Sequence, residues 1–146
     1  MAMRLRRPDE SGQMTVELAA VFPVVIVVAV IALNALTFFS ECAAFDNAFR
    51  EAVRVNAASP AYGQGLSDSV ALVEAALAAA FDDENLAVSV AVESVSGGYS
   101  RFSGTLTFLP TLFGLGLVDS VFGVEMPKLT HTVQFTVDVY KAGVLI

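Results

Sequence analysis

Cysteine, histidine and tryptophan are almost missing from this chain of 146 residues, which has one Cys, one His and no Trp. Cys42 alone cannot close an intramolecular disulfide, and without a CxxC pair or a Cys/His cluster the common zinc-site patterns are excluded. The sequence also has no nucleophile elbow, paired-His motif or P-loop, and no motif brings two carboxylates together. We therefore predict no catalytic residue, no metal and no cofactor, and a protein that is not an enzyme.

Charge is also scarce. Only 16% of the residues are charged and 55% are hydrophobic, whereas an average soluble domain has about 25% charged residues. The net charge is −7, although Arg4, Arg6 and Arg7 all come before the first carboxylate. The rest of the chain is thus strongly acidic, which argues against nucleic acid as a partner, because phosphate binding requires basic surfaces. The low charge indicates that part of the chain lies outside water.

One long apolar run, residues 18–39, contains no charged residue. As a helix its 22 residues measure roughly 33 Å, enough for a hydrocarbon core of about 30 Å. The arginines precede this run and Glu41 follows it, so the positive-inside rule places the N-terminus in the cytoplasm and the chain from residue 41 onward outside. We expect a single-pass protein of the cytoplasmic (inner) membrane, in contact with the lipid bilayer.

Two other interpretations of the apolar run fit less well. A cleavable secretory signal has an apolar region of about 7–15 residues that ends in a small-x-small site, but this run is longer and Glu41 stands where a small residue is needed. The same glutamate precedes Cys42, which argues against a lipoprotein signal. Pro23 and Asn34 interrupt the run, and Pro23 is expected to kink the helix because it removes one backbone hydrogen bond.

A carboxylate stands at the cytoplasmic edge of the apolar run, in the segment SGQMTVEL that contains Gly12, Gln13 and Glu17. One interpretation places Glu17 in the headgroup layer, where a negative charge in the first helical turn suits the helix dipole. A basic leader, a glycine, four residues, a glutamate and an apolar helix also resemble the type IV prepilin processing site. The resemblance implies cleavage between Gly12 and Gln13 by prepilin peptidase, on the cytoplasmic side, so that the helix stays attached.

The same resemblance gives Glu17 a role in assembly. Cleavage leaves a new cationic amine on Gln13, and in a fibre the carboxylate of Glu17 in one subunit can pair with that amine on a neighbour. Two charges that are each costly in an apolar bundle then offset one another, which favours one register.

The helical period continues beyond the apolar run. Apolar residues recur at spacings of four, three, four and four, which is one helix face: Phe38, Cys42, Phe45, Phe49 and Val53. We predict one helix over about residues 14–57, with Asp46 and Arg50 paired on its charged face. Cys42 is interpreted as a buried small apolar residue on the apolar face.

A second helix is predicted after a break at residues 59–65, which contain Pro and Gly. We expect Ser67 to be its N-cap, Asp68 to lie in its first turn, and residues 82–85, three acids and an asparagine, to follow its end. Its apolar face consists of five residues: Leu66, Val70, Val73, Leu77 and Phe81.

Apolar and polar residues then alternate in three segments, at residues 86–93, 102–108 and 129–139, with a turn signal at residues 96–98. We predict an α+β fold, in which the second helix and the outer half of the first cover one face of an antiparallel sheet of three or four strands. His131 has the parity of the apolar residues in the last strand, which indicates a buried or edge histidine.

Residues 110–127 are apolar but aperiodic, rich in Gly, and too short to span a membrane. Two interpretations remain open for this segment. It packs on the sheet as a loop, or it forms an exposed patch for a neighbouring subunit.

With these residues in view, the chain resembles the TadE family of pilin-like proteins from tight-adherence (Flp-type) pilus systems. Residues 12–17, which read Gly-Gln-x-x-x-Glu, and the early Pro23 are typical of TadE-like N-termini, and a Leu/Pro/Phe/Gly-rich connection before a Thr-rich strand is similar to the family's second half. Leu18 departs from the family, since Flp-type sites usually place Tyr after the glutamate. TadE, TadF and a diverged TadE-like protein are therefore not separated.

Membership of this family implies a minor pilin or pseudopilin that is processed by prepilin peptidase. Its other partners would be further pilins or pseudopilins, contacted through the N-terminal helix, and the pilus assembly platform proteins at the inner membrane, with incorporation into a surface pilus as a further expectation. The chain then divides into a leader peptide (1–12), an N-terminal helix (13–57) and an extracytoplasmic domain (58–146). The alternative is an unprocessed, signal-anchored module that binds a ligand or partner at the cell surface.

Overall fold

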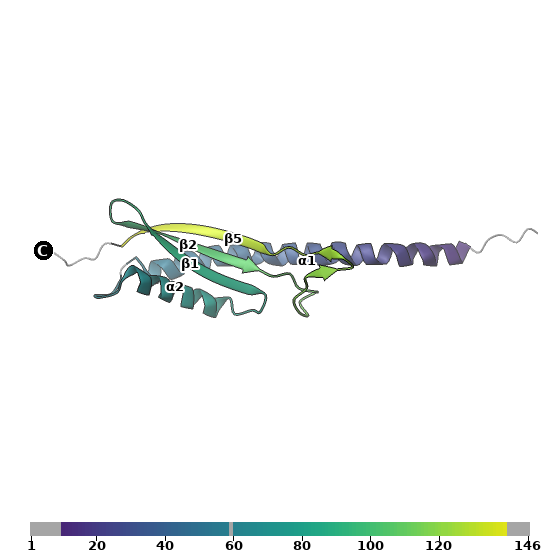
Figure 1. Ribbon diagram of the computed structural model, residues 1–146, viewed down its shortest axis with the longest axis horizontal. Helices are drawn as coiled ribbons and strands as arrows, with labels where there is room; N and C mark the ends of the chain where they lie inside the picture. The colour runs from purple at the N-terminus through teal and green to yellow at the C-terminus, as the bar shows by residue number, and fades with distance from the viewer. Residues whose placement is uncertain (1–9, 59, 140–146) are drawn as a thin grey trace, which may run out of the picture.

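The computed structural model describes residues 10–58 and 60–139 (Figure 1). A very long helix runs along one side, and a second helix and a sheet pack against its C-terminal part. The elements are α1 (Glu10–Asn56), α2 (Leu66–Ala80), β1 (Leu86–Ser94), β2 (Tyr99–Phe108), β3 (Ser120–Val121), β4 (Val124–Glu125) and β5 (Leu129–Asp138). The predicted α+β fold is confirmed.

Helix α1 has 47 residues and is about 70 Å long at 1.5 Å per residue. It begins four residues before the predicted start at residue 14 and ends at Asn56, so a single helix does join the apolar run to the domain. The helix continues through Pro23 without a break. The side-chain amide of Gln64 donates to the backbone carbonyl of Asn56 (3.0 Å), which satisfies one of the carbonyls that a helix end leaves unpaired.

The start of α2 differs from the prediction. Its N-cap is Gly65, not Ser67, and the carboxylate of Asp68 accepts a hydrogen bond from the Gly65 amide (2.8 Å). The third residue of the helix thus satisfies the cap amide, as it does in a capping box. Asp68 lies in the first turn and the helix ends before residues 82–85, as predicted.

The main sheet has three antiparallel strands in the order β1-β2-β5, which lies within the predicted three or four. The alternation of apolar and polar residues places one face of the sheet against α1 and α2. Gly97 and Gly98 form the predicted turn between β1 and β2, and both have φ near +90°, a conformation that glycine adopts without strain.

The core lies between the sheet and the two helices. It contains all of the second predicted stripe but only Phe45, Phe49 and Val53 of the first. Phe45 and Phe49 of α1 are fully buried, and they lie over Gly104 at the centre of β2. A Cβ atom at Gly104 would lie 2.5 Å from Cδ2 of Phe49. The absence of a side chain at Gly104 therefore allows the helix to pack this close to the sheet.

Residues 110–127 do not pack on the sheet, which was one of the two interpretations. They leave the end of β2, run along α1 toward its N-terminal part, and form the short hairpin of β3 and β4 there (Figure 1). Val121 and Met126 are buried against Val30 of α1. The segment lies along the helix because its buried apolar side chains pack against the apolar run of α1.

Candidate functional site

The residues of the predicted processing site lie in the first turns of α1. Gly12, Gln13 and Glu17 are exposed, and a Cβ atom at Gly12 would meet nothing within 4 Å. The side-chain amide of Gln13 donates a hydrogen bond to the carboxylate of Glu17 (3.2 Å) across one helical turn. The structure therefore places the acid beside the residue whose amine cleavage would free. Residues 1–9, which carry the arginines of the predicted leader, lie outside the described residues.

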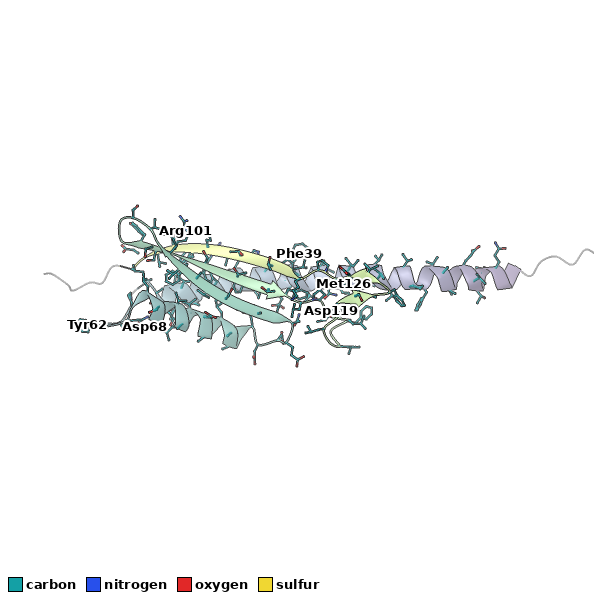
Figure 2. All side chains as sticks on the ribbon, in the orientation of Figure 1. Phe39, Tyr62, Asp68, Arg101, Asp119 and Met126 are labelled. Carbon is teal, nitrogen blue, oxygen red and sulfur yellow. The ribbon has the colours of Figure 1, made fainter. Side chains whose placement is uncertain are left out.

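The apolar run is almost uncovered. In the most apolar 18-residue window of the helix Gly12–Asn56 only 6% is buried, whereas a core helix of a soluble protein would be mostly buried. Figure 2 shows side chains projecting from this part of α1, away from the domain. Within residues 10–58 and 60–139, one helix is long and apolar enough to span a membrane, which is consistent with single-pass anchoring.

One strip of the apolar run is covered, and residues 110–127 cover it. Ile26, Val27 and Val30 of α1 pack against Val121 and Met126, and Val30 is fully buried. Figure 2 shows Met126 beside α1 on the N-terminal side of Phe39. Sequence analysis did not predict this contact.

Asn34 ties residues 110–127 to the helix. Its side-chain amide donates to the carbonyls of Val30 and Thr111 (2.8 Å each), and its side-chain oxygen accepts from the Thr111 amide (2.8 Å). The side chain pairs with both backbone groups of Thr111, as a neighbouring strand would. Sequence analysis treated Asn34 only as an interruption of the apolar run. The signal was present, because a lone amide among apolar residues needs a partner when it is buried.

A second polar contact joins α1 to the sheet. Nε2 of His131 in β5 lies 2.7 Å from Oδ1 of Asp46, and both side chains are partly buried. Asp46 was expected to pair with Arg50, and that prediction is wrong, because no ion pair joins these two within the described chain. His131 faces α1, as its parity in the strand predicted, and has a polar partner there.

Cys42 is buried on the apolar face of α1, beyond the end of the apolar run, as predicted. Burial raises the pKa of its thiol, and the negative charges of Asp46 and Glu41 raise it further. A thiol with a raised pKa is a weak nucleophile and metal ligand at neutral pH, because the thiolate is the reactive form. Cys42 therefore has the properties of a packing residue.

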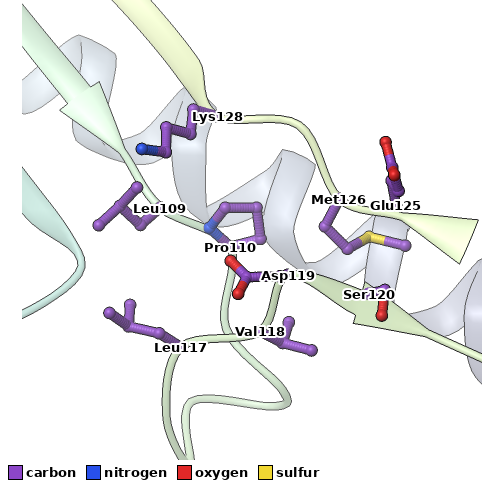
Figure 3. A pocket seen from close by; sticks show the side chains of 9 residues that line it. All are labelled: Leu109, Pro110, Leu117, Val118, Asp119, Ser120, Glu125, Met126 and Lys128. Carbon is purple, nitrogen blue, oxygen red and sulfur yellow. The ribbon is translucent and has the colours of Figure 1, made fainter.

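Several open clefts flank residues 110–127. Two of them, beside Thr111 and Gly114, are also lined by Asp83 and Asn85. Two others differ in their lining. The first, of about 440 Å³, is lined by polar and apolar residues that include Asp119, Glu125 and Lys128, with Pro110 between Asp119 and Lys128 in the view of Figure 3. The second, of about 420 Å³, has an almost entirely apolar lining that includes Ile26. Among the described residues no group of three His, Cys, Asp or Glu side chains could hold a metal ion.

Comparisons with known proteins give no independent assignment. No protein-family model matches the chain, and no curated protein and no solved structure matches it either.

Proposed function

We propose that this protein is a TadE-like minor pilin or pseudopilin, a membrane-anchored structural subunit that acts in assembly of a type IV/Flp-like pilus. One observation carries the proposal. The apolar run of α1 stands out from the domain, uncovered on most of its circumference, and Glu17 is the one charged residue between Gly12 and Ser40. An apolar helix that is exposed in this way requires lipid or other helices around it.

The geometry at the N-terminus of α1 supports processing between Gly12 and Gln13. Gly12 is exposed and has free space around it, so no other part of the described chain covers this position. Cleavage leaves the amine of Gln13 one helical turn from Glu17, and the same two groups on neighbouring subunits can pair when the helices pack side by side. Pairing offsets the cost of two charges in an apolar bundle and fixes the helix register.

The proposal includes a location and partners. The chain is anchored in the cytoplasmic membrane with its N-terminus inside, where prepilin peptidase cuts, and its α+β domain outside. Other pilins or pseudopilins bind the apolar run of α1, and the pilus assembly platform proteins act on the assembled subunits.

Mass spectrometry of the membrane-extracted protein tests the processing step. We expect an N-terminus at Gln13 in the wild-type chain and an intact Met1 in the Gly12→Val variant. Because a Cβ atom at Gly12 would meet nothing within 4 Å, we expect the fold of this variant to be unchanged. Ala20→Val, which adds the same bulk to an exposed site in the apolar run, serves as the control and keeps the Gln13 terminus.

Recovery of the protein in sheared surface fibres tests the assembly step. Glu17→Ala removes the carboxylate just before the apolar run and is expected to abolish recovery, whereas Glu41→Ala, just beyond the other end of the run, is expected to leave recovery unchanged. Wild-type protein that keeps Met1, together with fibres unaffected by Glu17→Ala, would contradict the proposal. That result would favour the unprocessed, signal-anchored binding module.

A further inference from the structure

Residues 111–125, named here the side loop, lie beside the part of α1 that has no charged residue. Asn34 and Ile26, which contact the side loop, lie seven and fifteen residues before Glu41. At 1.5 Å per residue these contacts are about 10 and 22 Å along the helix from that carboxylate. The side loop is thus fixed beside the apolar run, and its first turn also borders residues 83–85, which precede β1.

A bilayer around α1 must reach the side loop. From Glu17 to Ile26, where contact with the side loop begins, the helix advances nine residues, or about 14 Å. The hydrocarbon core of a bilayer is about 30 Å thick. The stretch of α1 without the side loop is therefore too short to fill the core alone, and the leaflet nearer the domain surrounds the side loop as well as the helix.

The outer surface of the side loop suits that environment. No charged residue occurs from Leu109 to Val118, and Phe113, Leu115 and Phe122 are exposed, the last two by 87% and 66%. Phe113 and Phe122 line the apolar cleft of about 420 Å³ together with Ile26 of α1. The cleft is open and its lining is almost entirely apolar, so it offers space for acyl chains but few polar partners for a soluble ligand.

The backbone of the side loop is also prepared for a low-dielectric environment, where unpaired backbone groups are costly. The amide of Leu112 donates to the carbonyl of Gly116 (3.0 Å), and that of Leu115 to the carbonyl of Leu112 (2.9 Å). The amide of Val118 donates to the carbonyl of Pro110 (3.0 Å). The turn that presents Phe113 and Leu115 is thereby closed by its own hydrogen bonds.

Charged residues also border the side loop. Asp119, Glu125 and Lys128 line the first cleft, and Val118 and Ser120 line this cleft as well as the apolar one. Asp83 and Glu84 line a further cleft together with Thr111, Gly114 and Leu115. The apolar and charged surfaces of the side loop are therefore neighbours, and a segment with both kinds of surface fits the boundary between acyl chains and headgroups.

Lipid fits the exposed surface better than a second copy of the chain does. At 3.6 residues per turn, the exposed apolar residues of α1 lie over the whole arc that the side loop leaves free: Val21, Phe22, Val24, Val25, Val28, Ile31, Leu33 and Leu36. A single partner helix would cover one stripe of this arc. A fluid solvent covers all of it, and the exposed side chains of the side loop continue the same surface.

We propose that the side loop inserts into the leaflet nearer the domain, with Phe113 and Phe122 among the acyl chains and an acyl chain in the cleft beside Ile26. The insertion sets the depth and rotation of α1 in the bilayer, because Asn34 fixes the side loop to the helix. It does not depend on cleavage at Gly12.

Single tryptophans test this insertion directly, because the chain has no Trp of its own. The full chain is reconstituted in phosphatidylethanolamine/phosphatidylglycerol vesicles as Phe113→Trp and Phe122→Trp variants. Quenching by lipids with brominated acyl chains is compared with quenching by aqueous acrylamide. Val21→Trp, at an exposed site in the apolar run away from the side loop, is the reference for contact with lipid, and Tyr62→Trp, at a fully exposed site far from the run, is the aqueous reference.

We expect Phe113→Trp and Phe122→Trp to follow Val21→Trp, with severalfold stronger quenching by brominated lipid than Tyr62→Trp shows and severalfold weaker quenching by acrylamide. The proposal is overturned if both follow Tyr62→Trp. It is also overturned if brominated lipid quenches these two tryptophans only when the protein-to-lipid ratio is lowered. That result would show that a second copy of the chain, and not lipid, covers the side loop at the higher ratio. A Val21→Trp variant that brominated lipid does not quench would overturn membrane anchoring together with the insertion. Repeating the measurement with Gly12→Val separates these outcomes from any failure of processing.

Discussion

The two halves of α1 are equally helical but have opposite surroundings. In the N-terminal half, taken as Glu10 to Glu41, apolar side chains lie on all sides and most are exposed. In the C-terminal half, from Cys42 to Asn56, most large apolar side chains form one stripe that the sheet and α2 cover, whereas Val55 is exposed. Phe39 is 68% exposed and Phe49 is fully buried, although ten residues of one helix separate them. The comparison teaches that the distribution of apolar residues around the helix, rather than their number, determines whether a segment packs into a core or requires an apolar solvent.

The largest effect that separates the two halves is expected from one Phe→Ala replacement in each. Phe49→Ala removes a ring from the core and leaves a cavity next to Gly104, which is expected to cost about 3–5 kcal/mol of domain stability. Phe39→Ala, its matched control, is expected to change domain stability by less than about 0.5 kcal/mol, because most of the ring is already exposed. Amide hydrogen exchange of β2 in detergent micelles measures both values. Equal losses in the two variants would refute the contrast between the halves.

A smaller and more local effect is expected at Asn34, where the side loop contacts the N-terminal half of α1. Asn34→Leu leaves the amide and the carbonyl of Thr111 without their partner, at a cost of about 1–3 kcal/mol. Amide exchange at Thr111 and Val118 is expected to accelerate, whereas exchange in β2 stays the same. Thr37→Val is the control, since the Thr37 hydroxyl donates only within its own helix, to Leu33 (2.9 Å). Unchanged exchange in the side loop would show that packing alone holds it.

Local periodicity explains how much of the fold the sequence could predict. The stripe that contains Phe45 and Phe49 and the alternation in β2 and β5 follow from the helical and strand periods, and both were confirmed. Isolated aromatic and polar residues on these elements have their partners far away in the chain, and local periodicity does not identify those partners. His131 meets Asp46 across 85 residues, which a search for neighbours four residues apart, such as Arg50, could not find.

The side loop and the start of α2 show the same limit. The side loop has no period, its strands have two residues each, and Asn34 contacts it across 77 residues. At the N-terminus of α2 the prediction required a side-chain oxygen at the cap, whereas the chain uses Gly65 and obtains the oxygen from Asp68. Gly12, Gln13 and Glu17 were found by their spacing alone, and the role proposed for them remains a prediction.

The smallest effect is expected at the border between the halves, where Cys42 begins the covered stripe. Because its pKa is raised, less thiolate forms at neutral pH, and iodoacetamide is expected to label it severalfold more slowly than an exposed thiol. The double variant Cys42→Ser, Tyr62→Cys provides that exposed thiol. The thiol of Cys42 binds its proton more tightly in the folded chain than in the unfolded chain. Its contribution to stability is therefore present below the pKa that it has in the unfolded chain, and it is lost as the pH rises through the pKa that it has in the folded chain. Equally fast labelling of both thiols at neutral pH would place Cys42 with the uncovered half of α1 and move the border toward Phe45.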